Sequence, residues 1–265
     1  MPLDMLDDPG QEPDGKPVLD PRLARAARTE QITRFEFTSQ WTAIDEDPCG
    51  GAEEWTLKAM VNLEDKISFR DPVKSGIDTR SKDLPFVTIA RADGFMLRPY
   101  FMMALSGWDL MNVFDAPSSE SMWLYETLYR NEDDDGLSDD ALEIVGADID
   151  GPGIVPDLHV HVRSIAFADG FASRRDLESI LDHLVARFDS SGIANTVISL
   201  ESDAIPGLAL ESAHDRIKTE SIMEELGFRL LGDVFLHRSQ LGSVEKARMK
   251  RLSRDVYANI RRKPL

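Results

Sequence analysis

The chain has 265 residues, of which 48 are acidic and 30 are basic, and its formal net charge is −18 at pH 7. A hydrophobic content of 42% is enough to bury a core. The excess of acids excludes nucleic acid as a partner of the acidic body and argues against attraction to an anionic membrane. Cys49 has no second cysteine to pair with, which excludes an internal disulfide and a zinc site built from several cysteines.

The two ends of the chain differ in charge. Residues 1–20 hold six acids, one lysine and four prolines, which predicts a flexible acidic leader and is the opposite of a signal peptide. Residues 243–265 hold eight bases and two acids, and we expect a basic helix or tail that either docks onto the acidic body or meets a partner. No apolar run reaches the about 18 residues of a membrane span, so we predict a soluble cytoplasmic protein. The oligomeric state stays open, a homodimer included.

Residues 21–150 are expected to form a strand-rich half with two helices and an acidic loop. A short helix is expected over 21–30. Apolar residues occupy every second position of 54–64, which is the period of a half-buried strand. We therefore predict a hairpin between 32–45 and 54–64, joined by the turn formers of 47–51.

A second hairpin is predicted between 86–91 and 95–101. Its turn would be Asp93-Gly94, a preferred pair for a type I′ turn. Ser106 is expected to be the N-cap of a first helix, and Pro117-Ser118-Ser119 are expected to begin a second helix that ends near Tyr129.

The acidic loop that follows has a partial calcium motif. Asn131, Asp133 and Asp135 are spaced like the first ligands of an EF-hand loop, and Gly136 follows them. Leu142 stands where the bidentate glutamate should be, so we expect a solvated loop rather than a calcium site.

Residues 151–242 show the clearest periodicity, and we expect them to form the core of the second half. The predicted order is strand, helix, strand, helix, strand, over 157–167, 173–188, 196–200, 214–226 and 228–236. A strand-helix-strand crossover favours parallel pairing of the first two strands. The two halves either share one sheet or form tandem modules.

Two motifs of this half resemble those of the GNAT superfamily of N-acetyltransferases. The loop Phe167–Ala172 is similar to the family's Q/R-x-x-G-x-G/A pattern, and Ile222–Phe228 is similar to the family's second helix, which ends in Leu-Gly-Phe. The resemblance covers residues 157–238 only. It implies an α/β (α+β) fold with a mixed central sheet flanked by helices.

The resemblance also implies a cofactor, acetyl-coenzyme A or another acyl-coenzyme A. Backbone N–H groups at a helix start can bind its pyrophosphate, and its pantetheine arm would run along the strand before the loop. The residues assigned to the pyrophosphate are Gly170, Phe171, Ala172, Ser173, Arg174 and Arg175, and those assigned to the pantetheine are Ile165 and Phe167.

Three positions depart from the family pattern. Phe167 replaces the usual first glutamine or arginine of the loop, Met223 stands where a tyrosine often acts as general acid, and Arg216 stands near a usual asparagine. These departures favour a degenerate member of the family.

The candidate catalytic residues are His159, His161 and Glu201. The histidines lie on one face of a strand, and either imidazole can act as a base near pH 7. Glu201 follows the next strand and is a second candidate base. The His-x-His spacing can also bind zinc, but no third ligand is identifiable and no metal is expected. The alternative is that both histidines cover a solvated face beside Arg163.

The resemblance implies acyl transfer from coenzyme A to an amine as the function, and the acidic body favours a cationic acceptor. That acceptor would be a cationic small molecule or the lysine of a basic protein. The alternative is a non-catalytic acidic binding or regulatory protein on the same fold, which engages a basic partner surface.

Overall fold

The computed structural model describes the greater part of the chain between residues 17 and 239. The described residues are 17, 19, 21–28, 30–44, 47–63, 86–115, 117–130, 136–145, 155–168, 171, 173–189, 196–204 and 220–239. Several predicted segments lie outside the described residues. They are the acidic leader apart from residues 17 and 19, the calcium-like residues 131–135, the first part of the predicted helix 214–226, and the basic tail. Within the described part, no helix is long and apolar enough to cross a membrane.

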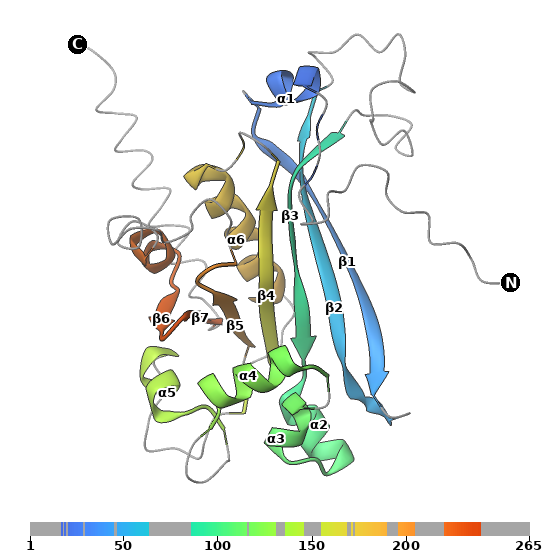
Figure 1. Ribbon diagram of the computed structural model, residues 1–265, viewed down its shortest axis with the longest axis vertical. Helices are drawn as coiled ribbons and strands as arrows, with labels where there is room; N and C mark the ends of the chain where they lie inside the picture. Colours follow the sequence, from blue (N-terminus) through green and yellow to red (C-terminus); the bar gives the residue numbers. More distant parts are fainter. Residues whose placement is uncertain are drawn as a thin grey trace, which may run out of the picture.

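Both halves of the chain contribute to one seven-stranded sheet (Figure 1), in the order β1-β2-β3-β4-β5-β7-β6. Its strands are β1 (Ile32–Ile44), β2 (Asp47–Asn62), β3 (Phe86–Leu97), β4 (Leu158–Phe167), β5 (Thr196–Glu201), β6 (Arg229–Leu231) and β7 (Val234–Ser239). Strands β4 and β5 are parallel, as the crossover between them predicted, and the other pairs are antiparallel. Because β3 pairs with β4, the halves are not tandem modules.

Helices cover both faces of the sheet. They are α1 (Pro21–Ala27), α2 (Pro99–Ser106), α3 (Leu110–Asp115), α4 (Ser119–Leu128), α5 (Asp139–Val145) and α6 (Arg174–Asp189), and residues 220–225 are also helical. One core cluster contains the apolar residues of α6 and of 220–225, and a second contains those of α2 to α5. The fold is therefore mixed α/β, with a predominantly antiparallel sheet between two helical layers.

The helix α6 forms as its sequence predicted. Its apolar residues recur at helical spacing and are all buried: Leu177, Ile180, Leu181, Leu184, Val185 and Phe188. Ser173 caps the helix, because its Oγ accepts the Asp176 N–H at 3.2 Å and donates to the Asp176 carboxylate at 2.6 Å.

The predicted hairpin about Asp93-Gly94 is wrong. Strand β3 continues through both residues to Leu97, and α2 begins at Pro99. The β3–β4 register shifts between Asp93 and Gly94, so Arg163 has no opposite residue and is the extra residue of a β-bulge. A Cβ at Gly94 would collide with the His161 carbonyl. Glycine is needed there for close backbone contact, not for a turn.

The prediction for Ser106 is also wrong, because Ser106 is the last residue of α2 and not the cap of the next helix. Gly107 ends α2 in the left-handed conformation, with φ of 69°. Asp109 caps α3 instead, since its carboxylate accepts the Asn112 N–H at 2.8 Å. The second predicted start is confirmed, because Ser118 and Ser121 form a capping box at the beginning of α4.

Two strand boundaries differ from the prediction. Residues 47–51, predicted as a turn, belong to β2; Asp47 and Gly51 pair with β1, and the register shifts between them. The predicted final strand over 228–236 is instead a hairpin of β6 and β7, because Gly232 with φ of 58° reverses the chain between them.

Candidate functional site

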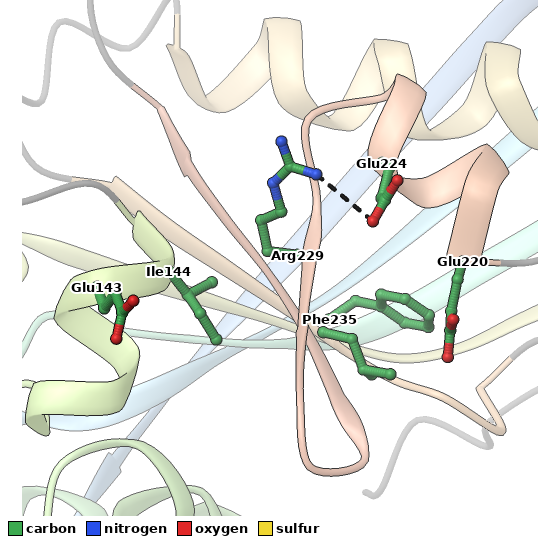
Figure 2. A pocket seen from close by; sticks show the side chains of 7 residues that line it. Glu143, Ile144, Glu220, Glu224, Arg229 and Phe235 are labelled. Atoms are coloured by element: carbon green, nitrogen blue, oxygen red, sulfur yellow. Dashed lines mark ion pairs between the residues drawn. The ribbon is translucent and has the colours of Figure 1, made fainter.

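A cavity of about 380 Å³ lies where α5, residues 220–225 and the β6–β7 hairpin meet (Figure 2). Its lining residues are Glu143, Ile144, Glu220, Glu224, Arg229, Leu230 and Phe235. Arg229 pairs with Glu224 at 3.6 Å, on a rim where both side chains are more than half exposed. The described lining of the cavity contains none of the candidate catalytic or cofactor-binding residues and no buried polar side chain.

The predicted catalytic residues lie elsewhere, in a buried polar chain beneath α4. The chain runs from the Tyr129 hydroxyl to Nδ1 of His159, from Nε2 of His159 to Oγ of Ser199 at 2.7 Å, and from that Oγ to Nδ1 of His161 at 2.9 Å. All four residues are 0% exposed. Burial of an unpaired polar group costs free energy, and each hydrogen bond of the chain offsets that cost for the two groups it joins.

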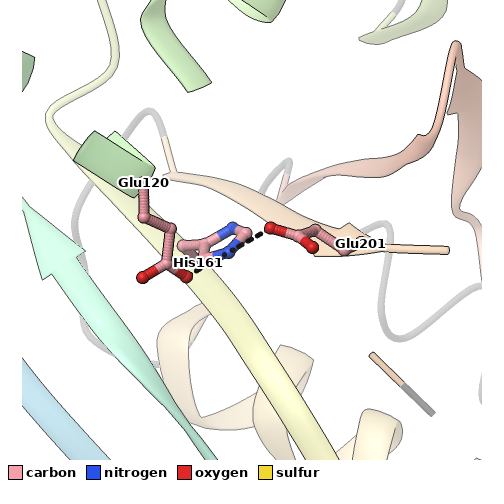
Figure 3. Close-up of side chains that lie close together, drawn as sticks. All are labelled: Glu120, His161 and Glu201. Atoms are coloured by element: carbon pink, nitrogen blue, oxygen red, sulfur yellow. Dashed lines mark ion pairs between the residues drawn. The ribbon is translucent and has the colours of Figure 1, made fainter. Parts of the chain in front are cut away.

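The outer end of this chain reaches two carboxylates (Figure 3). Nε2 of His161 lies 3.2 Å from Oε1 of Glu120 and 3.6 Å from Oε1 of Glu201. The side chains of Glu120 and Glu201 are 25% and 30% exposed, so they connect the fully buried imidazole to the surface.

Strand geometry explains why these groups meet. Alternate residues of a strand point to the same face, so His159 and His161 share one face of β4. The parallel register places Ser199 opposite His161, and Glu201 lies two residues further along β5 on that same face. Glu120 comes from the first turn of α4, where the Ser118–Ser121 capping box fixes the backbone.

The charges around His161 determine its protonation. Burial alone lowers the pKa of His161, but Glu120 and Glu201 outweigh that effect, and the pKa is raised above its ordinary value. Burial likewise raises the pKa of Glu120, but His161 and Arg163 outweigh it, and the pKa is lowered. Burial, with a smaller effect from His161, lowers the pKa of His159 to about 3. His159 is therefore neutral at pH values at which His161 carries a proton on both ring nitrogens.

These protonation states fit one direction of hydrogen bonding. Nδ1–H of His161 donates to Ser199, the Ser199 hydroxyl donates to Nε2 of His159, and Nδ1–H of His159 donates to the Tyr129 oxygen. Burial raises the pKa of Tyr129 well above its usual value, so the phenol stays neutral. The arrangement holds the His161 ring in one orientation.

Arg163, the bulge residue, lies beside the carboxylates and is 39% exposed. Its Nε donates to both oxygens of Glu120, at 3.2 and 2.9 Å. Its terminal nitrogens lie 3.6 Å from Glu54 and 3.8 Å from Asp93. The site entrance therefore has more carboxylates than cations.

The structure brings His159, His161 and Glu201 together, but in unequal roles. The alternative of a solvated histidine face is wrong, because both rings are fully buried. Among the residues described, His161 contacts the carboxylates, whereas His159 lies one step further inside.

Sequence reasoning missed Glu120, Ser199 and Tyr129. Ser199, a polar residue between the apolar Ile198 and Leu200 of a buried strand, was the available signal for one of them. The only sequence signal for Glu120 was its position in the first turn of a capped helix. Tyr129 had no signal beyond the general rule that a buried hydroxyl needs a hydrogen-bond partner.

The residues assigned to the pyrophosphate lie at the start of α6, with Gly170 and Ala172 outside the described residues. Phe171 is buried in the core, and Arg175 is exposed. Arg174 forms ion pairs with Glu178 and Glu225, both at 2.7 Å. Two carboxylates of the protein thus account for Arg174 without a bound anion.

The strand residues assigned to the pantetheine are part of the core. Ile165 and Phe167 have buried side chains, so they could offer a ligand only their backbone. The Ile165 N–H already donates to the Ala204 carbonyl at 2.7 Å. Pairing of a ligand with Ile165 would first require this hydrogen bond to open.

Comparisons of the chain with protein families, with curated proteins and with solved structures found no match.

Proposed function

We propose that the protein is an acyl-coenzyme A-dependent N-acyltransferase, similar to the acetyltransferases of the GNAT superfamily, which acts on an amine. The observation that carries this proposal is the group of Glu120, His161 and Glu201 where β4 and β5 separate. The β4–β5 pairing ends at Val162 and Leu200, while β4 continues through its bulge to Phe167. The resemblance to the GNAT superfamily implies a splayed strand for the pantetheine arm, and a proton-accepting group beside it suits transfer between a thioester and an amine.

The carboxylates serve the acceptor in this proposal. A cationic small molecule or a protein lysine approaches as an ammonium ion, which Glu120 and Glu201 attract. Glu201 accepts the proton, and the free amine nitrogen attacks the thioester carbon. An N–C bond forms as the C–S bond breaks, and the nitrogen then loses its second proton to solvent. Glu201 also returns its proton to solvent, and the leaving thiolate would be protonated from solvent, because the usual acid position holds the buried Met223.

The cofactor contacts would come from the start of α6 and from β4. The backbone at 170–173 would bind the pyrophosphate at the helix N-terminus, and Arg174 and Arg175 would add positive charge. Acetyl-coenzyme A or another acyl-coenzyme A supplies the activated acyl group. The protein's residues hold it and position the amine.

Calorimetric titration of the full chain with coenzyme A tests the proposal. We expect binding, and we expect Gly170→Glu to abolish it by placing a carboxylate against the pyrophosphate. Ala186→Glu is the matched control, since it adds the same charge at an exposed position of α6. A folded protein that binds neither coenzyme A nor acetyl-coenzyme A at millimolar concentration would overturn the proposal.

A second variant separates chemistry from cofactor binding. Glu201→Gln should leave coenzyme A affinity unchanged and lower kcat for amine acylation by about 10²- to 10⁴-fold, the contribution of a general base. Unchanged kcat would remove Glu201 from the mechanism.

Two contacts favour the competing function, a non-catalytic acidic protein that binds a basic partner. Arg174 is paired with Glu178 and Glu225, and the Ile165 amide is paired with Ala204, so two predicted cofactor contacts are already satisfied internally. Salt-sensitive capture of a basic protein, without any coenzyme A binding, would favour this function.

A further inference from the structure

The group of Glu120, His161 and Glu201 has a feature that acyl transfer does not explain. Nε2 of His161 is fully buried and points between the two carboxylates (Figure 3). Among the described residues it takes part in no hydrogen bond of good geometry. A buried ring nitrogen that forms ion pairs with two carboxylate oxygens, but no well-aligned hydrogen bond to either, is suited to a ligand between them.

Two distances from Nε2 of His161 lie close to the edges of a tetrahedral zinc site. With Zn–N of about 2.0–2.1 Å and Zn–O of about 2.0–2.2 Å, tetrahedral ligand atoms lie about 3.3–3.6 Å apart. Nε2 of His161 is 3.2 Å from the Glu120 oxygen and 3.6 Å from the Glu201 oxygen. The three ligand atoms all lie within 4.8 Å of one another. A single ion can therefore reach all three after small side-chain movements.

The surrounding hydrogen bonds are those of a metal-binding histidine. Such a histidine usually donates its other ring N–H to an oxygen that fixes the ring orientation. Nδ1 of His161 lies 2.9 Å from Oγ of Ser199, which is itself held by His159 at 2.7 Å. Arg163 bonds most closely to Oε2 of Glu120, at 2.9 Å, and so orients that carboxylate with Oε1 toward His161.

The charge of the group also fits a divalent cation. Two carboxylates neutralise a dication, and His161 adds no charge once the ion has displaced its Nε2 proton. The Arg163 guanidinium opposes a cation, but Glu54 and Asp93 lie 3.6 and 3.8 Å from it on its other sides. The partial exposure of both glutamates leaves a solvent side for a fourth ligand.

We propose that Glu120, His161 and Glu201 bind one Zn²⁺ ion, with water as the fourth ligand. Imidazole favours Zn²⁺, whereas Ca²⁺ prefers six to eight oxygen ligands and Mg²⁺ about six. Three protein ligands and an open position are typical of a zinc site that can exchange its fourth ligand. The ion would occupy the position of the acceptor ammonium in the proposed acyl transfer, so Zn²⁺ should compete with the amine and leave coenzyme A binding unaffected.

Titration of the metal-free full chain with ZnCl₂, followed by calorimetry, tests the site. We expect one Zn²⁺ ion to bind per chain, and we expect its affinity to depend on His161. His161→Ala and Glu201→Gln should each weaken that binding at least 10-fold, and Ser199→Ala should weaken it about 10- to 100-fold, as loss of a group that orients a ligand does. His183→Gln, which removes a histidine from α6, and Glu224→Gln, which removes a carboxylate from the other cavity, should leave it unchanged.

Two further measurements keep the result interpretable if a variant unfolds. Zn²⁺ should raise the Tm of the unmodified chain, and Ca²⁺ at the same concentration should not. Co²⁺ in place of Zn²⁺ should give the intense visible bands of tetrahedral coordination. Zinc affinity that is the same in the His161→Ala variant, a weak octahedral Co²⁺ spectrum, or no zinc binding at all would overturn the zinc site. Since none of these outcomes involves coenzyme A, failure here is distinct from failure of the acyltransferase proposal.

Discussion

The two faces of strands β4 and β5 are both buried, yet they are built from different chemistry. Toward α6 they present mainly apolar side chains, with the buried Thr196 at the start of β5 as the polar exception; the apolar ones are Leu158, Val160, Val162, Ile198 and Leu200. Toward α4 they present His159, His161 and Ser199, which are as deeply buried. Apolar burial stabilises the fold without further requirements, whereas each buried polar group needs a partner. A polar face in this position has no advantage for stability, which is why we take it as the candidate functional side of the sheet.

The apolar face should carry most of the stability, and its disruption gives the largest expected effect. Leu181→Ala on α6 removes a side chain that is 1% exposed, and we expect a loss of about 2–5 kcal/mol in the free energy of unfolding. Urea denaturation measures it. The control, Ala186→Ser at an exposed position of the same helix, should change stability by less than about 0.5 kcal/mol. A loss as small as that of the control would mean that α6 is not packed against the sheet.

On the polar face, the loss of a single hydroxyl group should already lower the free energy of unfolding. Ser199→Ala leaves Nε2 of His159 and Nδ1 of His161 without their shared partner, and we expect a loss of about 1–3 kcal/mol. Ser199→Cys keeps a weak donor of similar size and should recover part of it. If Ser199→Ala unfolds at the same urea concentration as the natural chain, the buried polar chain is not formed as described.

The sequence was sufficient for elements whose signal is local. The helical period of α6 and the start of α4 near Pro117–Ser119 depend on residues within one or two turns, and both predictions were confirmed. The alternation in β2 was equally readable, because one strand face is apolar.

Features that depend on distant contacts could not be predicted in this way. Asp93-Gly94 has the composition of a turn, but its conformation is decided by the His161 backbone on another strand. Glu120 joins His161 only because α4 packs over β4 and β5. A single sequence shows which residues can ionise, but not which of them share a cavity.

The ion pair between Arg174 and Glu225 lies at the rim of the apolar face, and it should affect coenzyme A binding more than it affects stability. Glu225→Gln removes one of the two carboxylates that pair with Arg174, and both side chains are more than a third exposed. The stability change should therefore be about 0–1 kcal/mol. In the proposed acyltransferase the released guanidinium is available to the pyrophosphate, so coenzyme A should bind a few-fold more tightly. The same variant combined with Arg174→Gln should lose that gain, and weaker binding in the single variant would contradict the assigned role of Arg174.

The smallest expected effect lies on the same helical layer, at His183. Its ring stacks on Phe35 with centroids 4.0 Å apart. Burial, with a smaller effect from Arg187, lowers the pKa of His183 below its ordinary value. The folded state then binds a proton less readily than the unfolded state does, so the contribution of neutral His183 is present above the ordinary pKa of about 6.5. It is lost as pH falls through the lowered folded-state value.

Comparison of the natural chain with His183→Gln isolates this contribution, since other groups that titrate in acid are common to both. Stability measured by urea denaturation at about pH 7.5 and about pH 5 should fall more steeply for the natural chain than for the variant, because the unperturbed pKa of about 6.5 lies between the two conditions. Equal slopes would show that His183 titrates alike in both states, and its burial against Phe35 would then have no energetic consequence. A difference here, together with a zinc affinity unchanged in the same variant, would separate the histidine of the apolar layer from the histidine of the polar face.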